Sequence, residues 1–83
     1  MIERGLADLQ AGRESTEALL VSIGAPRLRA LGLAIEQPLP DAERRLYDRL
    51  DVQDADSAHS RYNALIRRLV SYERSAECAR PRT

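Results

Sequence analysis

The sequence predicts a small all-α protein, a bundle of about four helices, two long and two short, completed by self-association or by a partner. Apolar residues recur along most of the chain at the three- and four-residue spacing of amphipathic helices. No stretch of useful length shows the alternation of apolar and polar residues that is typical of a strand. Because 83 residues suffice for one domain, we expect a single helical domain over residues 1–80 and a frayed tail over 81–83.

The first predicted helix runs from residue 2 to about residue 23. Its apolar stripe consists of Ile2, Leu6, Leu9, Leu20 and Ile23. Arg13 and Thr16 interrupt this stripe, and Gly12 lies in the same interruption. We therefore expect either a bend at Gly12 or an Arg13 that faces a partner carboxylate. Gly24 is expected to end the helix in a left-handed conformation.

A short second helix is expected after Gly24. Pro26 suits the first helical turn, where its missing N–H is not needed. Leu28 and Leu31 give the helix an apolar edge, and Gly32 can end it. Residues 36–40 contain two prolines, which predicts an extended connector.

The third predicted helix begins near Asp41, an aspartate suited to the N-cap or the first turn. Its apolar line consists of Ala42, Leu46 and Leu50, and two acid–arginine pairs lie four residues apart, Asp41 with Arg45 and Arg44 with Asp48. Residues 51–56 are expected to form an acidic turn.

The fourth predicted helix has the clearest pattern. Asp56 or Ser57 can cap its start, and Pro81 is expected to end it. Its uninterrupted stripe consists of Ala58, Tyr62, Leu65, Leu69, Tyr72 and Ala76, widened by Ile66 and Val70. So broad an apolar arc should dock against more than one neighbour, with Leu65 and Leu69 at the centre of the core.

Composition excludes several classes of protein. The chain has 13 basic and 13 acidic residues and is 43% hydrophobic, so it is neither a general polycation nor a disordered tail. One Cys and one His exclude an internal disulfide and a histidine-rich metal site. Every basic residue is Arg, which reflects either a GC-rich genome or selection for bidentate recognition of carboxylate or phosphate.

No catalytic or cofactor motif is recognisable. The chain lacks a Gly-rich phosphate loop, a nucleophile elbow and the HExxH pattern, so we expect neither an enzyme nor a cofactor. His59, Tyr62 and Asn63 cluster at the start of the fourth predicted helix, and His59 is the only histidine, the residue type best suited to acid–base chemistry at neutral pH. A ribonuclease-like site is conceivable there, but a satisfied polar patch is the preferred interpretation.

The sequence favours a cytoplasmic protein without a membrane span. Its longest run of apolar residues is far shorter than the ~20 residues that cross a bilayer. The first residues include acids and lack the apolar region of a secretory signal. The lone Cys78 suits a reducing compartment, and we expect it to be buried or inert.

The net charge of the chain is zero, but its C-terminal part is basic. Residues 57–83 carry a net charge of +4, and residues 1–56 carry −4. On a helical wheel, Arg61 and Arg68 flank the apolar stripe, Arg67 and Arg74 lie further outward, and small residues such as Ser71 lie between them. This surface is a solvated face, a strip that docks on a protein, or a strip that binds phosphates.

A partner or a second copy is expected because the core is thin. The only aromatics are three Tyr, and no disulfide or metal supplements the apolar burial of so short a chain. We therefore predict a non-enzymatic module that binds and covers a partner protein, or a homo-oligomer. The candidate partner-binding residues are Arg13, Arg61, Arg67, Arg68, Ser71 and Arg74. The alternative is a small nucleic-acid-binding regulator that uses the Arg-rich face of the last helix.

Residues 60–74, SRYNALIRRLVSYER, resemble the closing helix of some small bacterial helical proteins. Residues 28–32, LRALG, after Pro26, resemble the same proteins. These proteins can be encoded beside a larger toxin- or nucleotidyltransferase-type partner, so the resemblance implies an antitoxin or an accessory subunit. It contains no diagnostic motif, and no residue's role is carried over from it.

Overall fold

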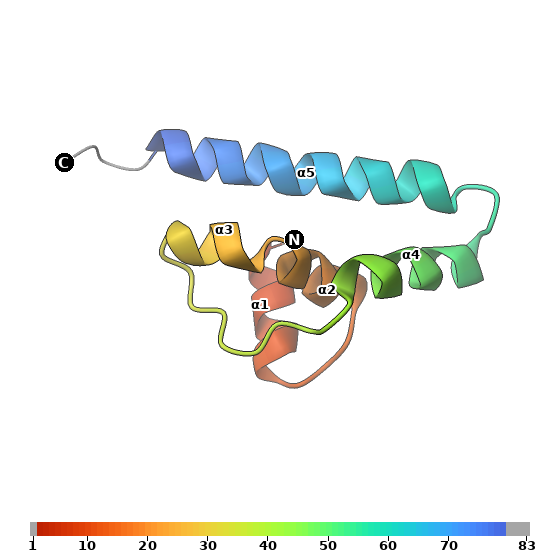
Figure 1. Ribbon diagram of the computed structural model, residues 1–83, viewed down its shortest axis with the longest axis horizontal. Helices are drawn as coiled ribbons and strands as arrows, with labels where there is room; N and C mark the ends of the chain where they lie inside the picture. The colour runs from red at the N-terminus through yellow and green to blue at the C-terminus, as the bar shows by residue number, and fades with distance from the viewer. Residues whose placement is uncertain (1, 80–83) are drawn as a thin grey trace.

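A computed structural model describes residues 2–79 of the chain. This part forms five helices and no strand, which confirms the all-α class (Figure 1). The helices are α1 (Ile2–Gln10), α2 (Thr16–Ile23), α3 (Ala25–Ala30), α4 (Ala42–Gln53) and α5 (Ala58–Ala79). The predicted helix end at Pro81 and the tail over 81–83 lie outside the described residues. None of these helices has both the length and the apolar character needed to span a bilayer.

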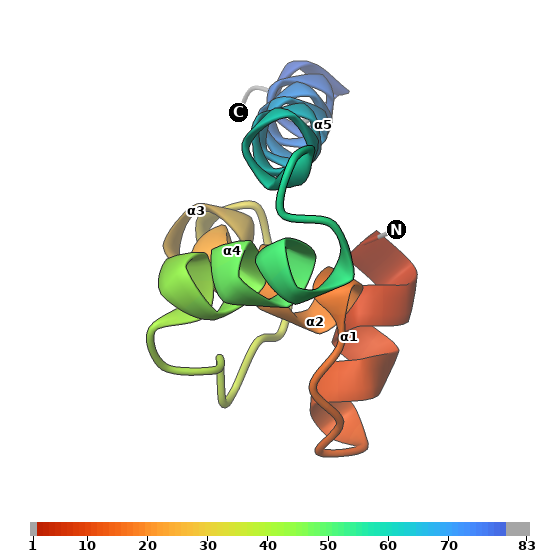
Figure 2. The same cartoon turned by 90° about the vertical axis from the view of Figure 1, so that its right-hand side faces the viewer.

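The helices form two layers. α5 runs along the length of the molecule, with α2, α3 and α4 beneath it and α1 steeply inclined on the outside (Figures 1 and 2). α2 lies at the centre, where it contacts every other helix. Five consecutive residues of α2, from Ala18 to Ser22, are buried, as expected for a helix surrounded by others.

The prediction of a single helix over residues 2–23 is wrong, because this segment forms two helices, α1 and α2. Gly12 adopts a left-handed φ of +73°, and the Arg13 N–H donates to the Asp8 carbonyl at 2.8 Å. Together with a Gly12-to-Leu9 bond, this is the Schellman motif that ends a helix. Ser15 then starts α2, since its Oγ accepts the Ala18 N–H at 3.1 Å.

α1 and α2 pack unusually closely at Gly5. A Cβ atom at Gly5 would lie 2.5 Å from both the Glu17 carbonyl oxygen and Val21 Cγ2. Because no real Cβ approaches other atoms so closely, only glycine allows this contact between the helices.

α3 confirms two predictions and corrects a third. Pro26 lies in its first turn, and Gly32 follows its last turn with a φ of +99°. Gly24, however, has a φ of −86° and is not left-handed. Its lack of a side chain matters for packing instead, since a Cβ at Gly24 would lie 3.0 Å from Leu69 Cδ1 of α5.

The connector between α3 and α4 is fixed to the core by two hydrogen bonds. Ser22 Oγ donates to the Ala18 carbonyl at 2.8 Å and accepts the Leu39 N–H at 2.9 Å. Arg29 Nε donates to the Ile35 carbonyl at 2.6 Å. The Ile35 side chain is buried, so the connector adds to the core.

The Ser22→Ala substitution should therefore destabilise the fold by about 1–3 kcal/mol, because the partly buried Leu39 N–H loses its acceptor. Urea denaturation followed by circular dichroism measures this loss. Ser60→Ala, on the exposed side of α5, is the matched control and should change stability little. Equal stability of the two variants would contradict the role given to Ser22.

α4 begins at Ala42, one residue after the position predicted for its cap. Asp41 occupies the N-cap position, as predicted, with a left-handed φ of 52°, but its side chain makes no capping hydrogen bond. α4 continues to Gln53, so its last turn replaces the first half of the predicted acidic turn. Its buried residues are Ala42, Leu46 and Leu50, as predicted.

α5 begins at Ala58 as predicted, but its buried face differs in detail. Leu69 is buried with 3% exposure, whereas Leu65 is only partly buried against the core. Tyr72, placed on the apolar stripe, is 38% exposed. Glu73, which the pattern gives no reason to bury, is only 4% exposed.

Candidate functional site

Four arginines of α5, Arg61, Arg67, Arg68 and Arg74, form a surface that we call the arginine face. All four are exposed, and none makes an ion pair with another residue of the described part. The predicted site residue Ser71 is also exposed and belongs to the same face. The structure therefore places five of the six candidate residues on one helix.

The two acids of α5 do not neutralise this face. Glu77 forms an ion pair with Arg27 of α3, with Arg27 Nη2 2.8 Å from Glu77 Oε2. This hydrogen bond, with the charges of Glu77 and Glu73, raises the pKa of Arg27. Glu73 is buried, and it too interacts with Arg27. Both acids interact with Arg27 of α3, so they do not neutralise the arginines on the outward side of α5.

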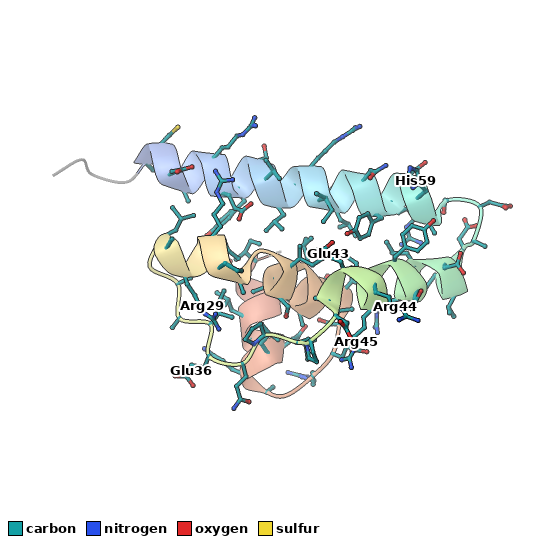
Figure 3. All side chains as sticks on the ribbon, viewed as in Figure 1. Arg29, Glu36, Glu43, Arg44, Arg45 and His59 are labelled. Carbon is teal, nitrogen blue, oxygen red and sulfur yellow. The ribbon has the colours of Figure 1, made fainter. Side chains whose placement is uncertain are left out.

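Three arginines of the lower layer have local partners, in contrast to the arginine face. Arg45 Nη1 of α4 lies 3.2 Å from Glu14 Oε1, and Arg44 Nε lies 4.0 Å from Asp48 Oδ2. Arg29 binds the connector carbonyl described above. Figure 3 labels these three on the lower layer, away from α5.

Arg13 does not belong to the arginine face. The loop that carries it lies on the opposite side of the molecule from α5 (Figures 1 and 2). Arg13 Nε lies 3.8 Å from Asp8 Oδ1 of the preceding helix. The carboxylate that Arg13 faces is therefore internal, and this candidate residue is separated from the other five.

The small residues between the arginines are all exposed. They are Ser60, Ala64, Ser71, Ser75 and Cys78. Their short side chains leave the backbone of α5 accessible to the close approach of another helix. Cys78 is a free, exposed thiol, so of the two expectations for it, buried or inert, the first is wrong.

The histidine cluster separates into two parts. His59 Nε2 lies 3.2 Å from Asn63 Nδ2, and His59 lies on the outer side of α5 (Figure 3). Tyr62 instead packs edge-to-face on Tyr47 of α4, with ring centroids 5.7 Å apart. The three side chains do not converge on a common cleft.

The environment of Tyr62 shifts the pKa of its hydroxyl. Burial, together with the negative charge of Glu43, raises the pKa of Tyr62 above its ordinary value of 10.0. Glu43 lies on the side of α4 that faces α5 (Figure 3). As the pH rises, the unfolded chain loses the Tyr62 hydroxyl proton before the folded protein does. The burial of neutral Tyr62 therefore contributes fully to the free energy of unfolding below pH 10, and this contribution is lost as the pH rises through the pKa of the folded protein.

Two charged residues that the sequence analysis did not select lie beside the arginine face. Arg4 of α1 and Glu17 of α2 line a groove together with Arg68 of α5. Arg4 and Arg68 are far apart in the sequence, so no local spacing could have connected them.

Comparison of the chain with protein-family models, with curated protein sequences and with solved structures finds no match.

Proposed function

We propose that this protein is a non-enzymatic interaction module whose arginine face binds and covers an acidic surface of a partner protein. An antitoxin-like neutraliser or an accessory subunit is the specific form of this proposal. One observation carries it. Among the described residues, the four arginines of the face have no ion-pair partner, because both acids of the same helix interact with Arg27 of α3 instead.

The geometry of α5 supports docking on a protein. A helix of 22 residues is about 33 Å long, so the arginines are displayed along a straight and regular element. Guanidinium groups pair with carboxylates in a bidentate way, which favours arginine at charged interfaces. The small residues between them let a partner helix approach closely. Both features fit an extended acidic helix surface.

The same charges disfavour a homodimer that buries two arginine faces against each other. In a two-fold dimer each residue meets the same patch of the other copy, so like charges would be juxtaposed. Self-association is still expected from the thin core, but it would use another surface. The arginine face therefore favours a partner of different sequence.

Nucleic-acid binding is the second candidate, because unpaired arginines also suit phosphates. Its support is weaker, since the chain has no overall basic excess and, along the described part of α5, Tyr72 is the one exposed aromatic side chain, too few for a stacking platform. Four arginines neutralise only a few phosphates, so the affinity would be low and strongly dependent on salt.

Charge reversal of Arg67 and Arg74 tests the proposal. The Arg67→Glu/Arg74→Glu variant should keep its helicity and melting temperature, because exposed and unpaired arginines contribute little to stability. It should lose a stoichiometric acidic partner that the unmodified protein retains from extract of its own cells. A pull-down with mass spectrometry measures the retention.

Arg44→Glu is the matched control, since the Arg44 side chain is 85% exposed on α4 and its ion pair is weak. This variant should retain the partner. A salt titration against generic RNA and DNA completes the test. Tight, salt-sensitive nucleic-acid binding with no protein retained would contradict the proposal and favour the second candidate.

A further inference from the structure

A groove runs between α5 and the pair formed by α1 and α2. It is lined by Arg4, Thr16, Glu17, Leu20, Leu65 and Arg68. Leu20 is fully buried beneath the groove, so the apolar floor that a ligand can reach is the partly buried Leu65. Arg4 and Arg68 belong to opposite walls, and both are exposed. The groove thus combines an apolar floor with basic walls from two separate helices.

The charges of the groove are not satisfied within the described part of the chain. Arg4, Glu17 and Arg68 lie around the same groove, yet none of them makes an ion pair with another described residue. Elsewhere on the surface, Arg45 and Glu14 show that such a pair forms readily when the geometry allows it. The three groups are therefore available to an incoming ligand.

The edge of α5 beside the groove extends the same pattern. Arg61, Leu65, Arg68 and Tyr72 follow one another at helical spacing, so they share one side of α5. Tyr72 is 38% exposed, which leaves an aromatic surface in line with Leu65. This edge alternates basic and apolar side chains, as do surfaces that receive an amphipathic helix.

From this juxtaposition we infer that the groove is the docking site for an acidic amphipathic helix of the partner protein. Its apolar side chains pack on Leu65 and Tyr72, and its carboxylates pair with Arg4 and Arg68. The inference rests on the proposed function and names the part of the partner that α5 receives. It also adds Arg4, from α1, to the binding surface.

Glu17 favours a protein ligand over a nucleic acid. A phosphodiester strand carries only negative charge and would meet the Glu17 carboxylate with repulsion. A protein helix can place a hydrogen-bond donor opposite Glu17 and carboxylates opposite the two arginines. The apolar floor likewise suits leucine-type side chains better than phosphates.

The test uses three fluorescent probes and the full chain. The first is a peptide of about five helical turns with Leu and Glu repeated at helical spacing. The second has Gln at every Glu position, and the third is an RNA oligonucleotide of similar length. Fluorescence anisotropy gives each affinity, and amide chemical shifts in NMR locate the bound peptide.

We expect the acidic peptide to bind more tightly than the Gln peptide and to shift the amides of Thr16 and Leu65. Arg4→Glu should weaken its binding by at least about tenfold, because a basic wall becomes acidic. Arg44→Glu should leave the affinity unchanged. Circular dichroism of both variants verifies that they fold.

Three results would overturn the inference. In the first, the acidic peptide binds Arg4→Glu as tightly as the unmodified protein and fails to bind Arg67→Glu/Arg74→Glu. This result would reject the groove as the docking site and would still support the arginine face as the binding surface. Tighter binding of the RNA than of the acidic peptide would identify a nucleic-acid site instead. No binding of the acidic peptide would reject the groove alone, because the pull-down tests the proposed function independently.

Discussion

Replacing Leu69 with alanine is expected to cost about 2–5 kcal/mol of the free energy of unfolding. Leu69 is the only large aliphatic side chain of α5 that is buried, within the described residues. Its methyl groups lie over Gly24, at the junction of α2 and α3, where a Cβ would be only 3.0 Å away. No side chain can fill the resulting cavity from the glycine side, so relaxation is limited.

Urea denaturation followed by circular dichroism measures the loss. Leu65→Ala is the matched comparison on the same helix and should cost less, because Leu65 is only partly buried. Since small domains are marginally stable, Leu69→Ala removes a large share of the total. Equal losses for the two variants would contradict the prediction that the more deeply buried leucine contributes more to stability.

The Gly5→Ala substitution is expected to destabilise the protein by about 1–3 kcal/mol, against the trend for helices. Intrinsic helix propensity alone predicts a gain of roughly 1 kcal/mol when alanine replaces glycine inside a helix. The added Cβ, however, would lie 2.5 Å from the Glu17 carbonyl oxygen and from Val21 Cγ2. Because the first contact is with backbone, α1 and α2 must move apart.

The sign of the change in melting temperature decides this prediction. Ala7→Gly, at an exposed position of the same helix, is the control and should lower stability by roughly 1 kcal/mol through propensity alone. If Gly5→Ala raises the melting temperature, the close contact between α1 and α2 is not present in solution. In a double-mutant cycle, Gly5→Ala and Val21→Ala together should cost less than the sum of their separate losses, because Val21→Ala removes the side-chain contact but also some core packing.

The fold was predictable wherever one helix carried an uninterrupted apolar stripe. This applies to α4, whose first residue and three buried positions agree with the pattern, and to the start of α5. Of the two residues of α5 expected at the centre of the core, only Leu69 is buried. The division between α1 and α2 was also signalled, since Gly12 and Ser15 are typical of a helix end and a helix start. The break between the helices was concealed because the same apolar spacing is found before Gly12 and after Ser15.

Features that depend on packing between distant segments could not be predicted. Glu73 is buried because α3 lies beneath that part of α5, and no pattern along the helix fixes where α3 lies. The exposure of Arg61, Arg67, Arg68 and Arg74 followed from the helical wheel. That they have no ion-pair partner within residues 2–79 did not follow from the wheel, since it depends on where Glu77 finds its partner in α3. The groove with Arg4 required the fold itself.

The central position of α2 has a consequence for how the molecule opens. The buried segment of α2, from Ala18 to Ser22, is covered by α1, α4 and α5, so we expect its amide protons to reach water when these neighbours leave together. Its exchange with solvent therefore reports the unfolding of the whole domain. α1 and the C-terminal end of α5 each have a side open to water, so they can detach locally at a lower free energy. A partner seated between α1 and α5 would suppress this local opening and slow exchange at both edges of the molecule.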